Sequence, residues 1–82
     1  MIISQACKYG PRAMVYLAQH NEEPVLSRDI AKELQIPEHF LAKILQDLSK
    51  NKLLLSFKGR GGGFKLARQP QSIKLLEVVE AI

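Results

Sequence analysis

The 82-residue sequence has no tryptophan, one cysteine and no long apolar segment. One cysteine cannot form an intrachain disulfide bond, which favours a reducing compartment, so we expect a cytoplasmic protein. No run approaches the roughly 20 apolar residues that a membrane-spanning helix needs, so no membrane role is expected. Aromatic residues are also few, at 6%, which argues against a large aromatic ligand pocket. These absences predict one small domain without disulfides or membrane spans.

Catalytic and metal-binding constellations are missing too. His20, His39 and Cys7 do not make a zinc or iron–sulfur site, and Cys7 fits a small core residue among apolar neighbours. Ser27, Asp29 and His39 each have a local explanation, as helix cap, partner of the helix dipole and surface residue. We therefore expect no enzyme, no catalytic residue, no metal ligand and no cofactor held by this chain.

Acidic residues are absent from positions 50–74, which hold seven Lys or Arg. The remaining positions hold five basic and eight acidic residues, so the net charge of +4 combines +7 in one segment with −3 elsewhere. A concentrated positive charge favours binding to a polyanion, and nucleic acid is the first candidate. A solvated basic surface is the alternative.

A glycine-rich segment lies in the middle of this basic stretch. Residues 59–63 contain four glycines and Arg60, and Lys58 and Lys65 lie on either side. Apolar, strand-like runs flank the glycines, so the pattern predicts a β-hairpin with a cationic tip. A nucleotide-binding loop would need Gly-Lys-Ser/Thr or a following helix, and neither is present. A tight hairpin without a ligand remains open.

Apolar periodicity predicts a helix over 5–19, with a kink at Gly10-Pro11 or a start at Pro11. An extended Val25-Leu26 precedes a second helix over 28–34, for which Ser27 is the expected N-cap. A third helix is expected over 38–50, with Pro37 in its first turn and Asn51 as a left-handed C-cap. Strands over 53–58 and 63–67 and a last helix over 74–82 complete the prediction.

Two helices joined by a short turn and followed by a β-hairpin define a winged helix-turn-helix. The expected fold is therefore mainly α with a small β-hairpin, in one domain over 1–82. The helix-turn-helix covers about 27–51, the wing about 53–67, and the start of a C-terminal helix 74–82.

Five sequence elements resemble the bacterial winged-helix regulators of the IscR/NsrR/CymR family. They are Tyr9…Arg12-Ala13…Tyr16-Leu17-Ala18, Ser27-Arg28-Asp29-Ile30-Ala31, Ile36-Pro37-Glu38-His39-Phe40-Leu41, Lys58 to Arg68 with its glycines, and Ser72-Ile73…Leu75 to Ile82. The resemblance implies a transcriptional regulator, with repression as its expected effect, that binds double-stranded DNA. Family members continue into a long dimerisation helix, and in sensor members three nearby cysteines hold an iron–sulfur cluster. Neither has a counterpart here, so we expect the chain to be a DNA-binding module of a longer protein or an unusually short relative. A homodimer and a cluster are expected for a longer form, and a weak or absent dimer for this chain.

The second helix of a helix-turn-helix enters the major groove. We expect base contacts from four residues of the third helix, His39, Ala42, Lys43 and Gln46. Backbone or minor-groove contacts are expected from the wing residues Lys58, Gly59, Arg60, Gly61 and Lys65. Further phosphate contacts are expected from Ser27, Arg28 and Lys50. A solvated helix face is the alternative for the third helix, and a winged-helix protein–protein module without nucleic acid is the alternative function. RNA binding is weaker, because no exposed sheet carries the stacking aromatics that RNA modules use.

Overall fold

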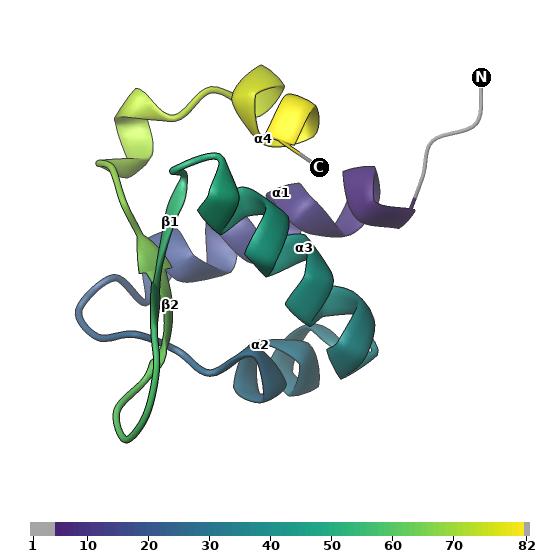
Figure 1. The fold of residues 1–82 in the computed structure, drawn as a ribbon. Coiled ribbons are helices and arrows are strands. Elements are labelled where there is room, and N and C mark those ends of the chain that lie inside the picture. The colour runs from purple at the N-terminus through teal and green to yellow at the C-terminus, as the bar shows by residue number, and fades with distance from the viewer. Residues whose placement is uncertain (1–4, 82) are drawn as a thin grey trace.

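The computed structural model describes residues 5–81, which form a winged helix-turn-helix (Figure 1). In chain order the elements are α1 (Gln5–Gln19), α2 (Ser27–Leu34), α3 (Glu38–Lys50), β1 (Leu54–Phe57), β2 (Gly63–Leu66), a 3₁₀ turn (Pro70–Ser72) and α4 (Leu75–Ala81). The predicted fold class is confirmed, and all four helices lie where the apolar spacing indicated. The predicted last residue of the C-terminal helix, Ile82, lies outside the described residues.

The core lies where α3 packs against α1, α2 and the first strand. Its largest fully buried side chains are Leu17, Ile30, Leu41, Leu45, Leu48 and Leu54. They come from the apolar faces of three helices and from the start of β1, so burying them fixes the direction of α3. The opposite face of α3 is consequently left at the surface.

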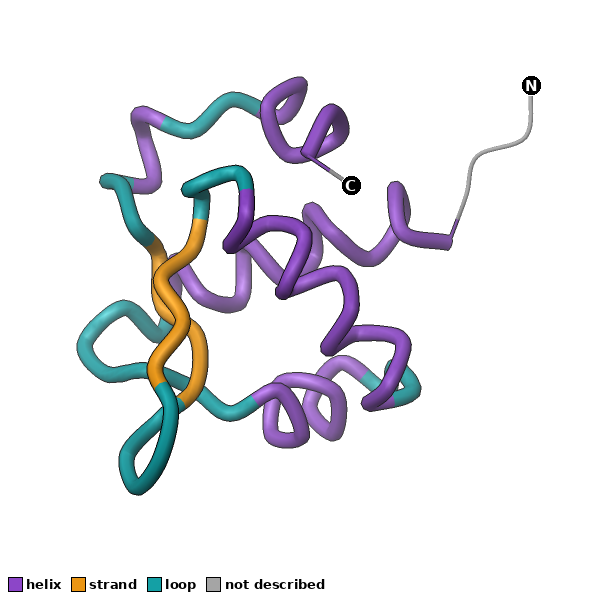
Figure 2. The backbone as a smooth tube through the Cα atoms, viewed as in Figure 1, coloured by secondary structure: helices purple, strands orange, loops and turns teal. Residues whose placement is uncertain are grey.

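The two strands form an antiparallel hairpin in which Leu54 pairs with Leu66 and Phe57 with Gly63. We call β1, β2 and the loop between them the wing. Val25, just before α2, adds a single bridge to β2: its N–H donates to the Phe64 carbonyl at 2.9 Å and its carbonyl accepts from the Phe64 N–H at 2.8 Å. Near its loop end, β2 is thereby held against the segment that precedes α2, while the loop itself extends beyond the helices (Figure 2).

The wing glycines have two structural roles. The Gly62 N–H donates to the Gly59 carbonyl at 2.9 Å, which closes a turn with Arg60 at its tip and Gly61 at φ 75°. Gly63 lies so close to the Val25 backbone that a Cβ there would collide with the Val25 carbonyl. The fold itself requires Gly63, and only Gly59 and Gly61 are exposed at the tip.

We expect Gly63→Ala to destabilise the protein by about 2 kcal/mol, because relieving the collision would break the two Val25–Phe64 hydrogen bonds at about 1 kcal/mol each. Thermal unfolding measures the loss, and hydrogen exchange should show faster exchange at the Val25 and Phe64 amides. Ser56→Ala, an exposed change in the same hairpin, is the control. An unchanged melting temperature for Gly63→Ala would contradict the close approach.

The helix ends differ from the local predictions in α2 and α3. Ser27 is the first residue of α2, and Leu26 occupies the N-cap position with extended backbone and no side-chain cap. The left-handed residue after α3 is Lys52 (φ 65°), whereas Asn51 has a φ of −92°. The Lys52 and Leu53 N–H groups donate to the Ser49 and Leu48 carbonyls, each at 3.0 Å, in a Schellman arrangement. The predicted N-cap was therefore wrong, whereas Asn51 is the C-cap residue as predicted but does not have the predicted left-handed conformation.

Two further local predictions, both at prolines, are corrected by the structure. α1 is one continuous helix that includes Pro11, so the alternative of a helix starting at Pro11 was wrong. Pro37 is the N-cap residue of α3 rather than a residue of its first turn. Its carbonyl accepts from the Leu41 N–H at 3.0 Å, which is the first hydrogen bond of the helix.

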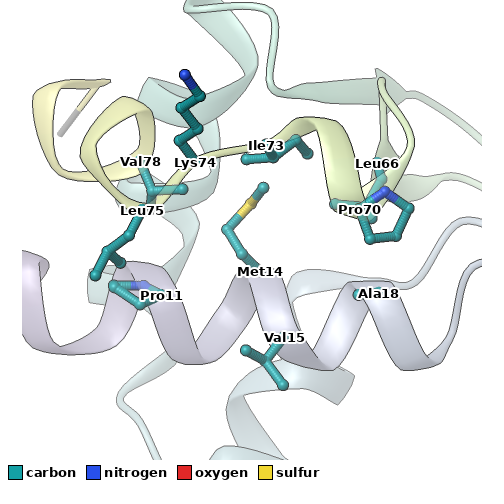
Figure 3. A pocket seen from close by; sticks show the side chains of 10 residues that line it. All are labelled: Pro11, Met14, Val15, Ala18, Leu66, Pro70, Ile73, Lys74, Leu75 and Val78. Atoms are coloured by element: carbon teal, nitrogen blue, oxygen red, sulfur yellow. The ribbon is translucent and has the colours of Figure 1, made fainter.

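An apolar groove of about 260 Å³ lies between α1 and the segment from Pro70 to Val78. Met14 points from α1 toward Ile73 in this groove, and the exposed side chains of Val15 and Leu75 lie along it (Figure 3). No helix within residues 5–81 combines the length and apolar character that a membrane crossing requires.

Candidate nucleic-acid interface

A polar stripe runs along the surface of α3. His39, Lys43, Gln46 and Lys50 recur at the spacing of one helix face, and all four side chains are exposed. Ala42 is half-buried at the edge of the stripe. The structure thus brings the predicted α3 residues onto one surface, and Ala42 contributes the least to it.

Lys43 forms an ion pair with Asp47, at 3.8 Å between Nζ and Oδ2. The Lys43 side chain is 79% exposed. Surface pairs at this spacing contribute about 0.3–0.5 kcal/mol, and the order Lys before Asp is the weaker one. The pair therefore orients the Lys43 side chain but is weak enough that its ammonium group can still bind a stronger acceptor.

The wing tip carries cations that have no partner within the described chain. Lys58 and Arg60 are exposed, and their side chains form no hydrogen bond or ion pair with any of residues 5–81. Gly59 and Gly61 on either side of Arg60 are exposed as well. Lys65 differs, because its Nζ donates to the Glu22 carbonyl at 3.2 Å and ties β2 to the loop after α1. Lys65 therefore has a hydrogen-bond partner within the domain, whereas the two tip cations do not.

The start of α2 contributes one exposed cation. Arg28 lies 3.9 Å from Asp29, measured from Nε to Oδ1, and both side chains are largely exposed. Ser27 is half-buried, and its hydroxyl forms no hydrogen bond with any of residues 5–81. Arg28 is thus available to a phosphate, whereas Ser27 could reach one only through its backbone N–H or a reoriented hydroxyl.

Sequence reasoning missed a contact that supports the turn between α2 and α3. Arg12 of α1 donates from Nη2 to the Leu34 carbonyl at 3.1 Å, at the end of α2, and its guanidinium lies 5.9 Å from the centre of the Tyr9 ring. Tyr9 in turn meets Phe40 of α3 edge to face, with ring centres 5.7 Å apart. The i, i+3 spacing of Tyr9 and Arg12 is the one feature of the sequence that could have suggested this group.

A second missed contact joins the segment after β2 to α4. Arg68 donates from Nη1 to Glu77 Oε1 at 2.7 Å and from Nη2 to the Ser72 carbonyl. The other Glu77 oxygen accepts from the Lys74 N–H at 2.8 Å and so caps the start of α4. The hydrogen bond from Arg68, followed by that from Lys74, lowers the pKa of the Glu77 carboxyl. Its ionised form, which makes both bonds, is accordingly lost only when the pH falls below its ordinary range.

The part of the chain that the structure describes does not fit a metal or iron–sulfur site. No three His, Cys, Asp or Glu side chains among residues 5–81 come together in a way that could hold a metal ion. Cys7, in α1 and half-buried, is the one cysteine of the sequence. A cluster with thiolate ligands needs several cysteines. The interface therefore has to be understood from charge and shape.

Comparisons with known proteins agree on one family. A profile of the Rrf2 family, described as an iron-dependent transcriptional regulator, matches residues 3–82. A protein of Aquifex aeolicus named as an HTH-type transcriptional regulator is 40% identical over 80 residues, which are 98% of this chain and 56% of that protein.

Two solved structures are similar to this chain in both sequence and fold. IscR of T. potens is 35% identical with a TM-score of 0.90, over 100% of this chain and 61% of that one. CymR of B. subtilis is 28% identical with a TM-score of 0.91, over 99% of this chain and 64% of that one. The chain therefore spans between 56% and 64% of the length of these three proteins.

Proposed function

The chain belongs to the Rrf2 family of transcriptional regulators, and we propose that it binds double-stranded DNA with α3 in the major groove and the wing tip on the backbone and minor groove. The proposed regulatory effect is repression, exerted in the cytoplasm. The family consists of transcriptional regulators, which confirms the expectation that the chain is not an enzyme. In this proposal a homodimer and any iron–sulfur cluster would require sequence outside these 82 residues.

The observation that carries the proposal is the pair of cations at the wing tip that have no partner among residues 5–81. Lys58 and Arg60 are exposed on an extended loop, and positions 50–74 contain no acidic residue. Such cations are attracted by the negative potential of a narrow minor groove. Their neighbours Gly59 and Gly61 carry no side chain that would keep the loop from a groove.

The stripe on α3 supports base contacts. His39 and Gln46 are exposed and their side chains have no partner among the described residues, so both are free to meet base edges. Gln can pair bidentately with adenine, and Lys43 can donate to guanine O6 and N7. Ala42 offers only a methyl group, which suits contact with a thymine methyl. Lys50, at the end of the stripe, and Arg28 suit phosphates.

The salt dependence of duplex binding tests this function. The affinity of the 82-residue chain for a pool of random-sequence duplexes should fall with rising salt, by about 0.9 in the log–log slope for each phosphate neutralised. A slope near zero, or no binding at low salt, would favour the alternative of a protein–protein module. Retention on single-stranded RNA in preference to duplex DNA would also contradict the proposal.

We expect Lys43→Ala to reduce discrimination among operator variants by about 1–3 kcal/mol at the base that Lys43 contacts, because a lost base contact no longer separates the right base from the wrong one. Competition binding with a selected duplex and its single-base variants measures the change. Lys8→Ala removes the same charge from the exposed side of α1 and is the matched control. A uniform loss across all sequences would make Lys43 a phosphate contact instead.

A further inference from the structure

Two large apolar side chains are exposed on β1. Leu55 is 47% and Phe57 44% exposed, although both lie within a regular strand. Residues two apart in a strand share a face, so these side chains form one surface. Leu54, on the other face, is only 2% exposed and belongs to the core. Leu55 and Phe57 therefore form an outer face of the wing, which we call the apolar wing face.

The cross-strand neighbours of this face carry no acidic side chain. The cross-strand partner of Leu55 is Lys65, and the partner of Phe57 is Gly63, which has no side chain to cover the ring. Packing over a cross-strand glycine is a known structural use of an aromatic residue and can explain the buried part of Phe57. It leaves the exposed 44% of Phe57 and the whole exposure of Leu55 unexplained.

We propose that the apolar wing face packs against the deoxyribose wall of duplex DNA, beside the phosphates that Lys58 and Arg60 bind. The inference rests on the proposed DNA binding and extends it by a second kind of contact. Two properties of the face favour DNA as the occupant. Phe57 directly precedes Lys58 and is therefore continuous with the cationic tip, and no Asp or Glu lies between positions 50 and 74. A groove wall offers this combination, because sugar carbons alternate with phosphates.

A second copy of the chain fits this face less well. β1 is an edge strand, and pairing it with another β1 would bring Lys52 and Lys58 of both copies close together. Like charges across paired strands are destabilising. Duplex DNA satisfies the same cations, and so the charge around the face distinguishes the two occupants.

Replacing Phe57 by threonine tests the proposal, because threonine removes the ring but keeps a residue suited to a strand. About 90 Å² of exposed Phe57 surface at about 25 cal/mol per Å² corresponds to a loss of affinity of up to about 40-fold. The salt slope should not change, since no phosphate contact is lost. Binding of random-sequence duplexes by the 82-residue chain, measured over a range of salt concentrations, gives both quantities. Leu55→Thr should show a smaller loss of the same kind.

Leu76→Ala is the matched control, because Leu76 is an exposed apolar residue on α4, away from the wing. Equal affinity of Phe57→Thr and the parent chain would overturn the proposal, as would an affinity loss accompanied by a smaller salt slope, which would indicate displacement of the cationic loop. A change in self-association without a change in DNA affinity would assign the face to contact between copies.

Melting temperatures identify variants that are unfolded. If Phe57→Thr is unfolded, Leu55→Thr provides the test. Failure of the parent chain to bind DNA would instead refute the proposed function.

Discussion

Two copies of this chain joined by a flexible linker are expected to bind a two-half-site operator about 10² to 10⁴ times more tightly than the single chain. Linking makes the second binding event intramolecular, so the gain comes from effective concentration and not from new contacts. The single chain should bind near the non-specific range of about 10⁻⁴ to 10⁻⁶ M.

The surface of the domain explains why we expect the single chain to dimerise weakly. α4 exposes Leu75, Leu76 and Val79, but it has only seven residues. Its length is thus about 10 Å. The groove beside it holds about 260 Å³. A specific interface should bury more than about 1,000 Å², which this surface is too small to supply.

The measurement uses a duplex selected from a random pool with the linked protein. The linked protein on a duplex with one half-site destroyed is the control, and it should lose the gain. Sedimentation of the single chain at micromolar concentration tests the premise. A stable dimer there, or equal affinity of the linked and single chains, would show that the domain already carries an interface of its own.

The second large effect is expected at the wing tip. Replacing Lys58 and Arg60 together by alanine should lower the salt slope by about two units, because each neutralised phosphate contributes about 0.9. If the double variant and the parent chain bind equally at 1 M salt, the affinity of the double variant at 0.1 M salt should be about 60-fold lower. The loss should be similar for every duplex sequence, since phosphate contacts carry no direct sequence information.

Lys8→Ala with Lys32→Ala removes the same charge from α1 and α2 and provides the control for this experiment. Both lysines are exposed, and neither lies on the α3 stripe or the wing. If affinity depended only on net charge, the two double variants would behave alike. Unchanged affinity and slope after loss of Lys58 and Arg60 would show that the wing does not contact DNA.

The elements of this fold could be predicted because burial imposes a regular spacing on them. Leu41, Ile44, Leu45 and Leu48 follow the helical period, and a short hairpin is the simplest use of two apolar runs around glycines. The exact ends of the helices were harder to predict. The preference for a left-handed residue at Asn51 is weaker than the demand to bury Leu53 against Leu48, and that demand places the turn at Lys52.

The positive charge of the site could be predicted from the sequence, but the hydrogen-bond partners of its side chains could not. Sequence reasoning treated Lys58, Arg60 and Lys65 alike, yet Lys65 donates to the Glu22 carbonyl, 43 residues away in the sequence. The exposure of Phe57 was also missed, because an apolar residue in a strand is normally expected to be buried. Both features depend on which segments meet in three dimensions, and no local pattern encodes that.

The two hydrogen bonds of Glu77 have a consequence for how related sequences should diverge. Replacement of Arg68 removes one partner and leaves the Lys74 N–H bound to the carboxylate, so α4 keeps its cap. Replacement of Glu77 uncaps the helix and at the same time removes the ion pair with Arg68, which keeps only its hydrogen bond to the Ser72 carbonyl. Among descendants of this sequence, position 68 should therefore accept substitutions while position 77 stays acidic, and losses at 77 should arise mainly in lineages where position 68 has already changed.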